Sequence, residues 1–160
     1  MPRDFKKMTL DEALVGLEAM LAEAEKDPSK PVTMCVSDEA GYIICFYRMD
    51  GGSDIDLDMV MKKCFTSAIM GNTTELFLKG LKVRDYPFYE FNHSYATAVP
   101  GGVPIVSPDT ERAELKGGII SPMRGQIGAC AVSGRSFSED EAIAKIGVEA
   151  IQRAIWGKSK

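Results

Sequence analysis

The sequence has 160 residues, 45% of them apolar, with 19 basic and 23 acidic side chains and a formal charge of −4. This length and composition predict one domain over residues 1–160 with its own core, and the mildly acidic surface argues against nucleic acid as the partner. Because no apolar run reaches the roughly 18 residues of a membrane-spanning helix and no signal peptide is recognisable, we expect a cytoplasmic protein without membrane contact.

A capping box predicts the first helix. Thr9 is a candidate N-cap, and Glu12 follows three residues later to complete the box. Apolar residues then repeat at helical spacing. The helix is expected to end near Lys26, because Pro28 and Pro31 cannot continue it.

Eight further elements follow along the chain. Two apolar runs around a short turn predict a β-hairpin, and helical spacing then predicts two helices. Three more apolar runs predict strands, and Ser136 with the acidic residues behind it caps a last helix. The predicted ranges, in chain order, are 32–37, 42–48, 55–70, 73–81, 100–106, 114–121, 125–133 and 136–156. This order predicts a largely antiparallel sheet with helices on its faces.

The cysteines form no C-x-x-C pair, and each lies in an apolar stretch. We interpret them as reduced, buried thiols rather than as metal ligands or disulfide partners. They are Cys35, Cys45, Cys64 and Cys130.

Several motifs occur along the chain in an order that resembles one protein family. They are LDEA (10–13), MD (49–50), KCFTSA (63–68), PGGVPI (100–105), IGACAVSG (127–134) and DEAIA (140–144). Together they resemble the GlcG/HbpS/PduO C-terminal-like family, and the likeness covers nearly the whole chain.

This resemblance implies an α/β (α+β) fold of the profilin-like type, with a five-stranded, largely antiparallel sheet and helices on both faces. It also implies homo-oligomers, dimers or larger, with a ligand pocket near a subunit interface. Family members are associated with haem binding, while certain relatives act as small-molecule enzymes, including lyases for hydroxylamino aromatic acids. The family is therefore a better guide to fold than to activity.

His93 is the only histidine, and hence the only imidazole available for iron or for proton transfer. It lies in segment 85–98, which holds five aromatic rings without regular spacing and is interpreted as a long functional loop. Tyr89 and Tyr95 are placed to flank a flat ligand beside it. The alternative is a histidine bonded to backbone, with the rings covering the core. The iron-associated H-E-x-x-E pattern of certain relatives is absent, so the resemblance assigns no iron ligand.

Four other residues are candidates for ligand contact. Gly101 and Gly102 permit a tight turn and close approach by a ligand or another subunit. Lys63, at the position of the family's lysine, and Arg124 are candidates for pairing with a ligand carboxylate. A lysine on such a helix more often extends its ammonium group to solvent, and that interpretation is favoured for Lys63.

The leading hypothesis is a protein that binds haem or another flat aromatic ligand, with His93 as the iron ligand if haem is bound. The alternative is an enzyme on the same fold, acting on a small aromatic or hydroxy acid. In that case His93 or Tyr95 would serve as the acid–base group, and Lys63 or Arg124 would hold the carboxylate. A third hypothesis is an accessory subunit without a small ligand.

Overall fold

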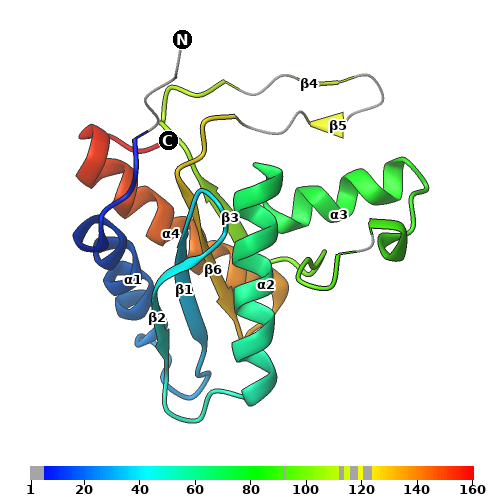
Figure 1. Cartoon of the computed structure of the whole chain (residues 1–160). Coiled ribbons are helices and arrows are strands. Elements are labelled where there is room, and N and C mark those ends of the chain that lie inside the picture. The colour runs from blue at the N-terminus through cyan, green and yellow to red at the C-terminus, as the bar shows by residue number, and fades with distance from the viewer. Residues whose placement is uncertain (1–5, 92, 112–113, 116–118, 121–123) are drawn as a thin grey trace.

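A four-stranded antiparallel sheet lies between two layers of helices (Figure 1). The computed structural model describes residues 6–91, 93–111, 114–115, 119–120 and 124–160. The helices are α1 (Leu10–Ala24), α2 (Asp54–Met70), α3 (Thr74–Val83), the short 3-10 helix η1 (Phe88–Phe91) and α4 (Phe137–Trp156). The strands of this sheet are β1 (Thr33–Asp38), β2 (Ile43–Arg48), β3 (Gly102–Ile105) and β6 (Gly128–Ser133).

Local sequence signals set the helix ends as predicted. Thr9 and Ser136 each accept the backbone N–H three residues on, and both capping boxes form. At the end of α2, Gly71 adopts a left-handed conformation with φ of 62°, which glycine accommodates without strain. All four predicted helices are confirmed, with ends that differ by at most a few residues.

The sheet has the strand order β2-β1-β6-β3, so β2 and β3 are its edges. Val36 at its centre lies opposite Cys45 on one side and Cys130 on the other. The antiparallel sheet and the helices on both faces are confirmed. The described residues place four strands in it, so the expected count of five is not confirmed.

The prediction of one strand over residues 114–121 is wrong. In that stretch β4 (Glu114–Leu115) and β5 (Ile119–Ile120) are two-residue strands that pair with each other. A single strand cannot do this, and the sequence between them contains two glycines, which is typical of a hairpin connection. Residues 116–118 and 121–123 lie outside the described part of the chain.

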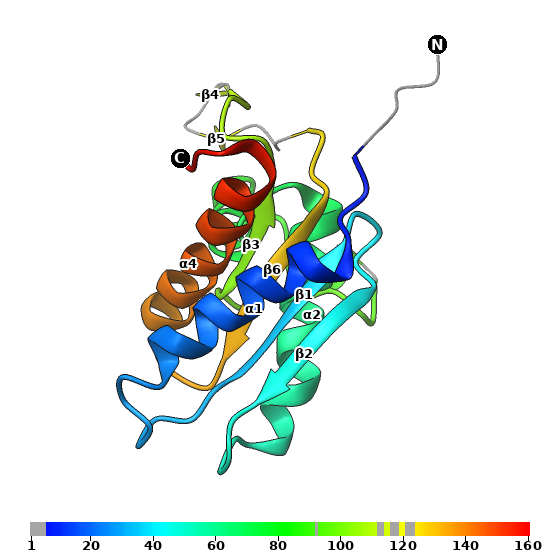
Figure 2. The same cartoon turned by 90° about the vertical axis from the view of Figure 1, so that its left-hand side faces the viewer.

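Two apolar layers fill the space between sheet and helices. Figure 2 shows α1 and α4 side by side over one face, with α2 behind the sheet. Helices α1 and α4 can approach closely because Gly16 and Gly147 have no Cβ atom. A Cβ on Gly16 would lie 2.4 Å from Ile151, and one on Gly147 would lie 2.7 Å from Met20. The α2 side has a smaller core, built around Val60, Cys64 and Ala68.

The cysteines are free thiols, as predicted, and three of them are buried. Burial raises the pKa of Cys45, which is only partly buried, to about 11, and it raises the pKa of Cys35 and Cys130 well above the usual value. They therefore pack as small apolar side chains. Among the described helices, none has the length and apolar content to cross a membrane.

Candidate functional site

His93 is exposed in the loop of residues 85–98, which we call the aromatic loop, and its ring lies against α2. Its ring centroid is 5.1 Å from that of Phe65, and the ring of Tyr95 meets Phe65 edge-on at 5.3 Å. The backbone N–H of Tyr95 donates to His93 Nδ1 at 3.1 Å. When the imidazole is neutral, this bond places the ring proton on Nε2. His93 and Tyr95, two of the predicted site residues, are thus brought together.

Four aromatic rings of this loop are exposed. Tyr86, Phe88, Tyr89 and Tyr95 are between 38% and 76% exposed. Phe88 leans edge-on against Phe77 of α3, and the loop is fixed to α2 by the Thr97 N–H, which donates to Thr66 Oγ1 at 2.9 Å. Of the alternative interpretation, the histidine bonded to backbone is confirmed, whereas these four rings are each more than a third exposed.

Lys63 is 1% exposed, so the expectation that it extends to solvent is wrong. Its side chain extends from α2 toward β6 and α4. The ammonium group donates to Asp140 Oδ2 at 3.1 Å and to the Val132 carbonyl at 2.9 Å. Asp140, at the start of α4, also accepts the backbone N–H of Arg135 at 3.0 Å. The partner that determines this burial lies 77 residues away in sequence.

The Lys63–Asp140 pair is held against the preference of both groups for water. Burial lowers the pKa of Lys63, and the charge of Asp140 opposes that shift. Burial likewise raises the pKa of Asp140, against the attraction of Lys63 and the backbone donors. Because the pair also bonds to the Val132 carbonyl and the Arg135 N–H, it ties α2 to β6 and α4. In this arrangement Lys63 is not available to a ligand carboxylate.

Gly101 and Gly102 lie directly over Lys63. A Cβ on Gly101, where φ is 129°, would sit 2.6 Å from the Val132 carbonyl oxygen and 2.8 Å from Lys63 Nζ. A Cβ on Gly102 would sit 2.4 Å from the carbonyl oxygen of Lys63. Close approach is required here, as the sequence suggested, but the neighbour is the protein's own buried lysine.

The remaining predicted residues lie apart from this pair. Tyr89 is on η1 and 76% exposed, and Arg124 is exposed on the segment that leads into β6. Two residues later, Gln126 Nε2 donates to the Ala68 carbonyl at 2.8 Å, so this segment borders the last turn of α2. Within the described residues, no three His, Cys, Asp or Glu side chains gather as a metal site.

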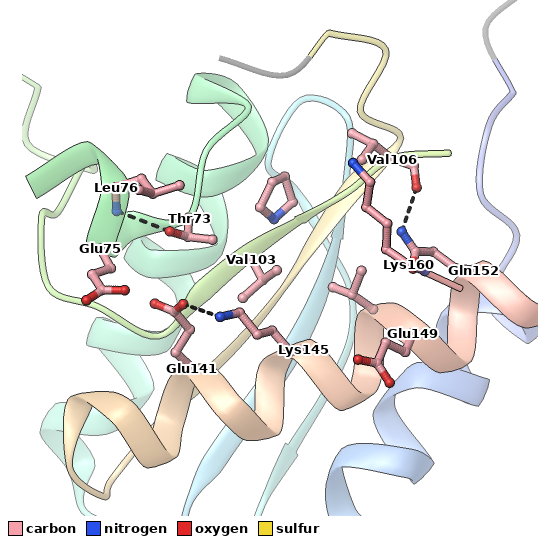
Figure 3. Close-up of a pocket in the computed structure, with 12 residues that line it drawn as sticks. Thr73, Glu75, Leu76, Val103, Val106, Glu141, Lys145, Glu149, Gln152 and Lys160 are labelled. Atoms are coloured by element: carbon pink, nitrogen blue, oxygen red, sulfur yellow. Dashed lines mark hydrogen bonds and ion pairs between the residues drawn. The ribbon is translucent and has the colours of Figure 1, made fainter. Parts of the chain in front are cut away.

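A cavity of about 380 Å³ lies along the outer edge of β3, between α3 and α4 (Figure 3). We call it the β3-edge cavity. Its apolar floor comes from Val103, Pro104 and Val106 on the strand side, with Leu76 and Val148 from the two helices. Its polar lining residues are Thr73, Glu75, Glu141, Lys145, Glu149, Gln152 and Lys160.

Glu141 is the buried acid of this cavity, and the sequence did not single it out. It is 6% exposed; its Oε1 contacts Lys145 Nζ at 2.7 Å, while its Oε2 has no hydrogen-bond partner among the described residues. Glu141, Val148 and Gln152 recur at steps of seven and four, which places them on one face of α4. Polar residues on the same helix face as Val148 are the one sequence signal at this position, and they do not by themselves identify a cavity.

Comparisons with known proteins agree with this fold. A family model described as "Haem degrading protein HbpS-like" matches residues 8–149. No curated protein matches the sequence.

Among solved structures, a double mutant of HbpS from Streptomyces reticuli is 22% identical with a TM-score of 0.71, covering 92% of this chain and 88% of that one. Klebsiella pneumoniae ORFY is 18% identical with a TM-score of 0.71, covering 94% and 96%. The PduOC:heme complex is 18% identical with a TM-score of 0.68, covering 91% and 95%. At these identities the structures establish a shared fold. Because the family model spans most of the sequence, this chain belongs to the HbpS-like family.

Proposed function

We propose that this protein binds haem, or another flat aromatic ligand, on the surface formed by Phe65, His93 and Tyr95. The observation that carries the proposal is the exposure of an imidazole against aromatic rings that the fold leaves uncovered. Burying such a ring contributes about 1.5–3 kcal/mol, so a group of exposed rings is typical of a binding surface. The family description and the haem complex of one structural relative support haem as the ligand.

His93 is the iron ligand in this proposal, and its present hydrogen bond with the Tyr95 N–H must change when iron binds. Coordination through Nε2 requires the ring proton to move to Nδ1. The Tyr95 N–H, which donates to Nδ1 in the structure, must then find another acceptor. Haem binding is therefore expected to be accompanied by a rearrangement of the turn between His93 and Tyr95.

A second copy of the chain completes the site in this proposal. One exposed surface covers only one face of a flat macrocycle and leaves the other in water. Two copies that meet through their exposed rings, with Tyr89 the most exposed of them, enclose both faces. The homo-oligomer expected from the family would thus be coupled to ligand binding.

Hemin titration tests the proposal. The purified protein should shift and intensify the Soret band of hemin, and His93→Ala should weaken both changes. Metal-free protoporphyrin, which lacks the iron, should bind wild type and His93→Ala about equally, because only ring contacts remain. Tyr47→Ala, a half-exposed ring on the far edge strand β2, serves as the control and should change neither titration. A hemin spectrum identical to that in buffer would rule the proposal out.

A further inference from the structure

The outer edge of β3 has no backbone donor to offer. Backbone groups alternate along a strand, and the Gly101 and Ile105 carbonyls accept from the segment of β6. The groups of Gly102 and Pro104 therefore face outward. The Gly102 N–H already donates to Thr74 Oγ1 at 3.0 Å, and Pro104 has no N–H. A further strand would find no free backbone donor along β3, so this edge is not suited to extending the sheet.

The positive groups around the β3-edge cavity are already engaged. Lys145 contacts one oxygen of Glu141, and Lys160 Nζ donates to the Thr110 carbonyl. The Gln152 amide N–H donates to the Val106 carbonyl at 2.9 Å. Each of these groups thus already has an acceptor in the protein, while both ammonium groups keep their positive charge.

Glu141, which lines the cavity, has one carboxylate oxygen, Oε2, without a donor in the described part of the chain. Figure 3 shows the Glu141 carboxylate directed into the space between α3 and α4, with Lys145 on one oxygen. The other oxygen is buried and has no partner among the described residues. Two more such atoms, on Thr33 and Asn72, do not line the cavity. A buried carboxylate oxygen without a donor is unfavourable, and a ligand N–H would satisfy it.

The acids of the lining differ in their partners. Glu75 lies in the first turn of α3 and contacts Lys79 at 3.4 Å, and Glu149 contacts Arg153 at 3.9 Å. Glu75, Glu141 and Lys145 also line the neighbouring cavity over Pro100 and Phe137, together with Lys79 and Lys82. Among the described residues, the buried acid oxygen of the lining that lacks a partner is therefore Glu141 Oε2.

We propose that the β3-edge cavity binds a small organic cation, an amidinium or a primary ammonium group on a compact apolar body, with Glu141 as its anchor. The cationic group donates to Glu141 Oε2 in a charge-assisted hydrogen bond. The apolar body rests on Val103, Pro104 and Val148. A cavity of about 380 Å³ is within the size range of small-molecule sites, and apolar cavities of roughly 150 Å³ hold benzene. This site is separate from the aromatic surface and does not depend on haem.

Titration with three ligands of one shape tests the charge. Benzamidine, benzamide and benzoate share a ring but carry a positive, a neutral and a negative group. Chemical shifts of the backbone amides of Leu76, Val103 and Gln152 should follow benzamidine binding to the wild-type chain, at least tenfold tighter than benzamide, with no binding of benzoate. Equal affinities for benzamidine and benzamide, or shifts at other residues only, would overturn the proposal.

Three variants test the anchor. Glu141→Gln keeps the shape and should weaken benzamidine binding at least tenfold, whereas Glu149→Gln, on the same cavity wall, should change it less than threefold. Lys145→Gln removes an exposed side chain that competes for Glu141 and should tighten binding severalfold. Its exposure keeps this variant informative if Glu141→Gln folds poorly. Unchanged affinity in Glu141→Gln, or weaker binding in Lys145→Gln, would contradict the assignment.

Discussion

Asp140 and Glu141 are consecutive carboxylates at the start of α4, and they occupy opposite environments. Asp140 points into the protein, where Lys63 and the Arg135 N–H satisfy it. Glu141 faces the β3-edge cavity, and one of its oxygens has no partner among the described residues. Both side chains are more than nine-tenths buried. Burial alone therefore does not identify a functional acid; an incomplete set of partners does.

The largest expected effect comes from breaking the satisfied pair. Lys63→Met leaves Asp140 buried without its counter-charge and should lower the free energy of unfolding by about 3–5 kcal/mol. Urea unfolding measures the loss. Lys62→Met, which removes only the surface pair with Asp58, should cost less than about 1 kcal/mol. A loss below 1 kcal/mol in Lys63→Met would show that the pair does not stabilise the fold.

The glycine above the pair should give the next largest effect. Gly101→Ala places a Cβ against Val132 and Lys63 in a backbone conformation that alanine rarely adopts. We expect a loss of about 2–3 kcal/mol in the same unfolding experiment. Gly80→Ala is the matched control, because its Cβ meets nothing within 4 Å in the α3 helix, and it should gain about 0.5–1 kcal/mol. Similar effects at the two positions would refute the close-approach argument.

Alkaline pH should lower the stability of the fold through its buried thiols. The folded chain keeps the thiols of Cys35, Cys45 and Cys130 protonated above pH 9, where the unfolded chain releases those protons. Stability should therefore be complete below pH 9 and decrease as the pH rises toward the raised pKa values, by up to about 1.4 kcal/mol per pH unit for each thiol. Unfolding between pH 8 and 10.5 measures the slope. Cys45→Ala should make it shallower, and an equal slope in that variant would be inconsistent with this cause.

The smallest effect is expected at Glu141, with the opposite sign. Glu141→Leu removes a buried oxygen without a donor and should raise the free energy of unfolding by about 1 kcal/mol. Lys145, about half exposed, returns to water in that variant. Glu149→Leu should stay within about 0.5 kcal/mol of wild type. If Glu141→Leu instead loses 2 kcal/mol or more, Glu141 belongs with Asp140 as a structural acid.

The features that could be predicted from the sequence are those that depend on residues close together in the chain. The capping residues Thr9 and Ser136 set helix ends through contacts within three residues, and the order of elements gave the layers of the fold. The burial of Lys63 was mispredicted because helical periodicity leaves it beside the apolar face, while its environment is decided by Asp140 in the last helix. Sequence distance hid that pairing.

The candidate sites divide in the same way. Gly101 and Gly102 were expected to admit a ligand or another subunit, but the sequence cannot state that Lys63 is what approaches. Glu141 was missed since a glutamate followed four residues later by a lysine is typical of an exposed helix face. Only the meeting of α4 with β3 and α3 turns that pair toward a cavity.

The close crossing of α1 and α4 sets the size of the cavity from behind. Gly147 lies against Met20, one residue before Val148 on the cavity wall. Because α1 packs directly against α4, we expect the α4 wall of the cavity to stay in place when a ligand enters. Enlarging Gly147 to alanine would press on Met20 of α1 and on Cys130 of β6, and would so displace the α4 wall of the cavity. Selectivity for ligand size is thus adjustable at a residue that no ligand touches.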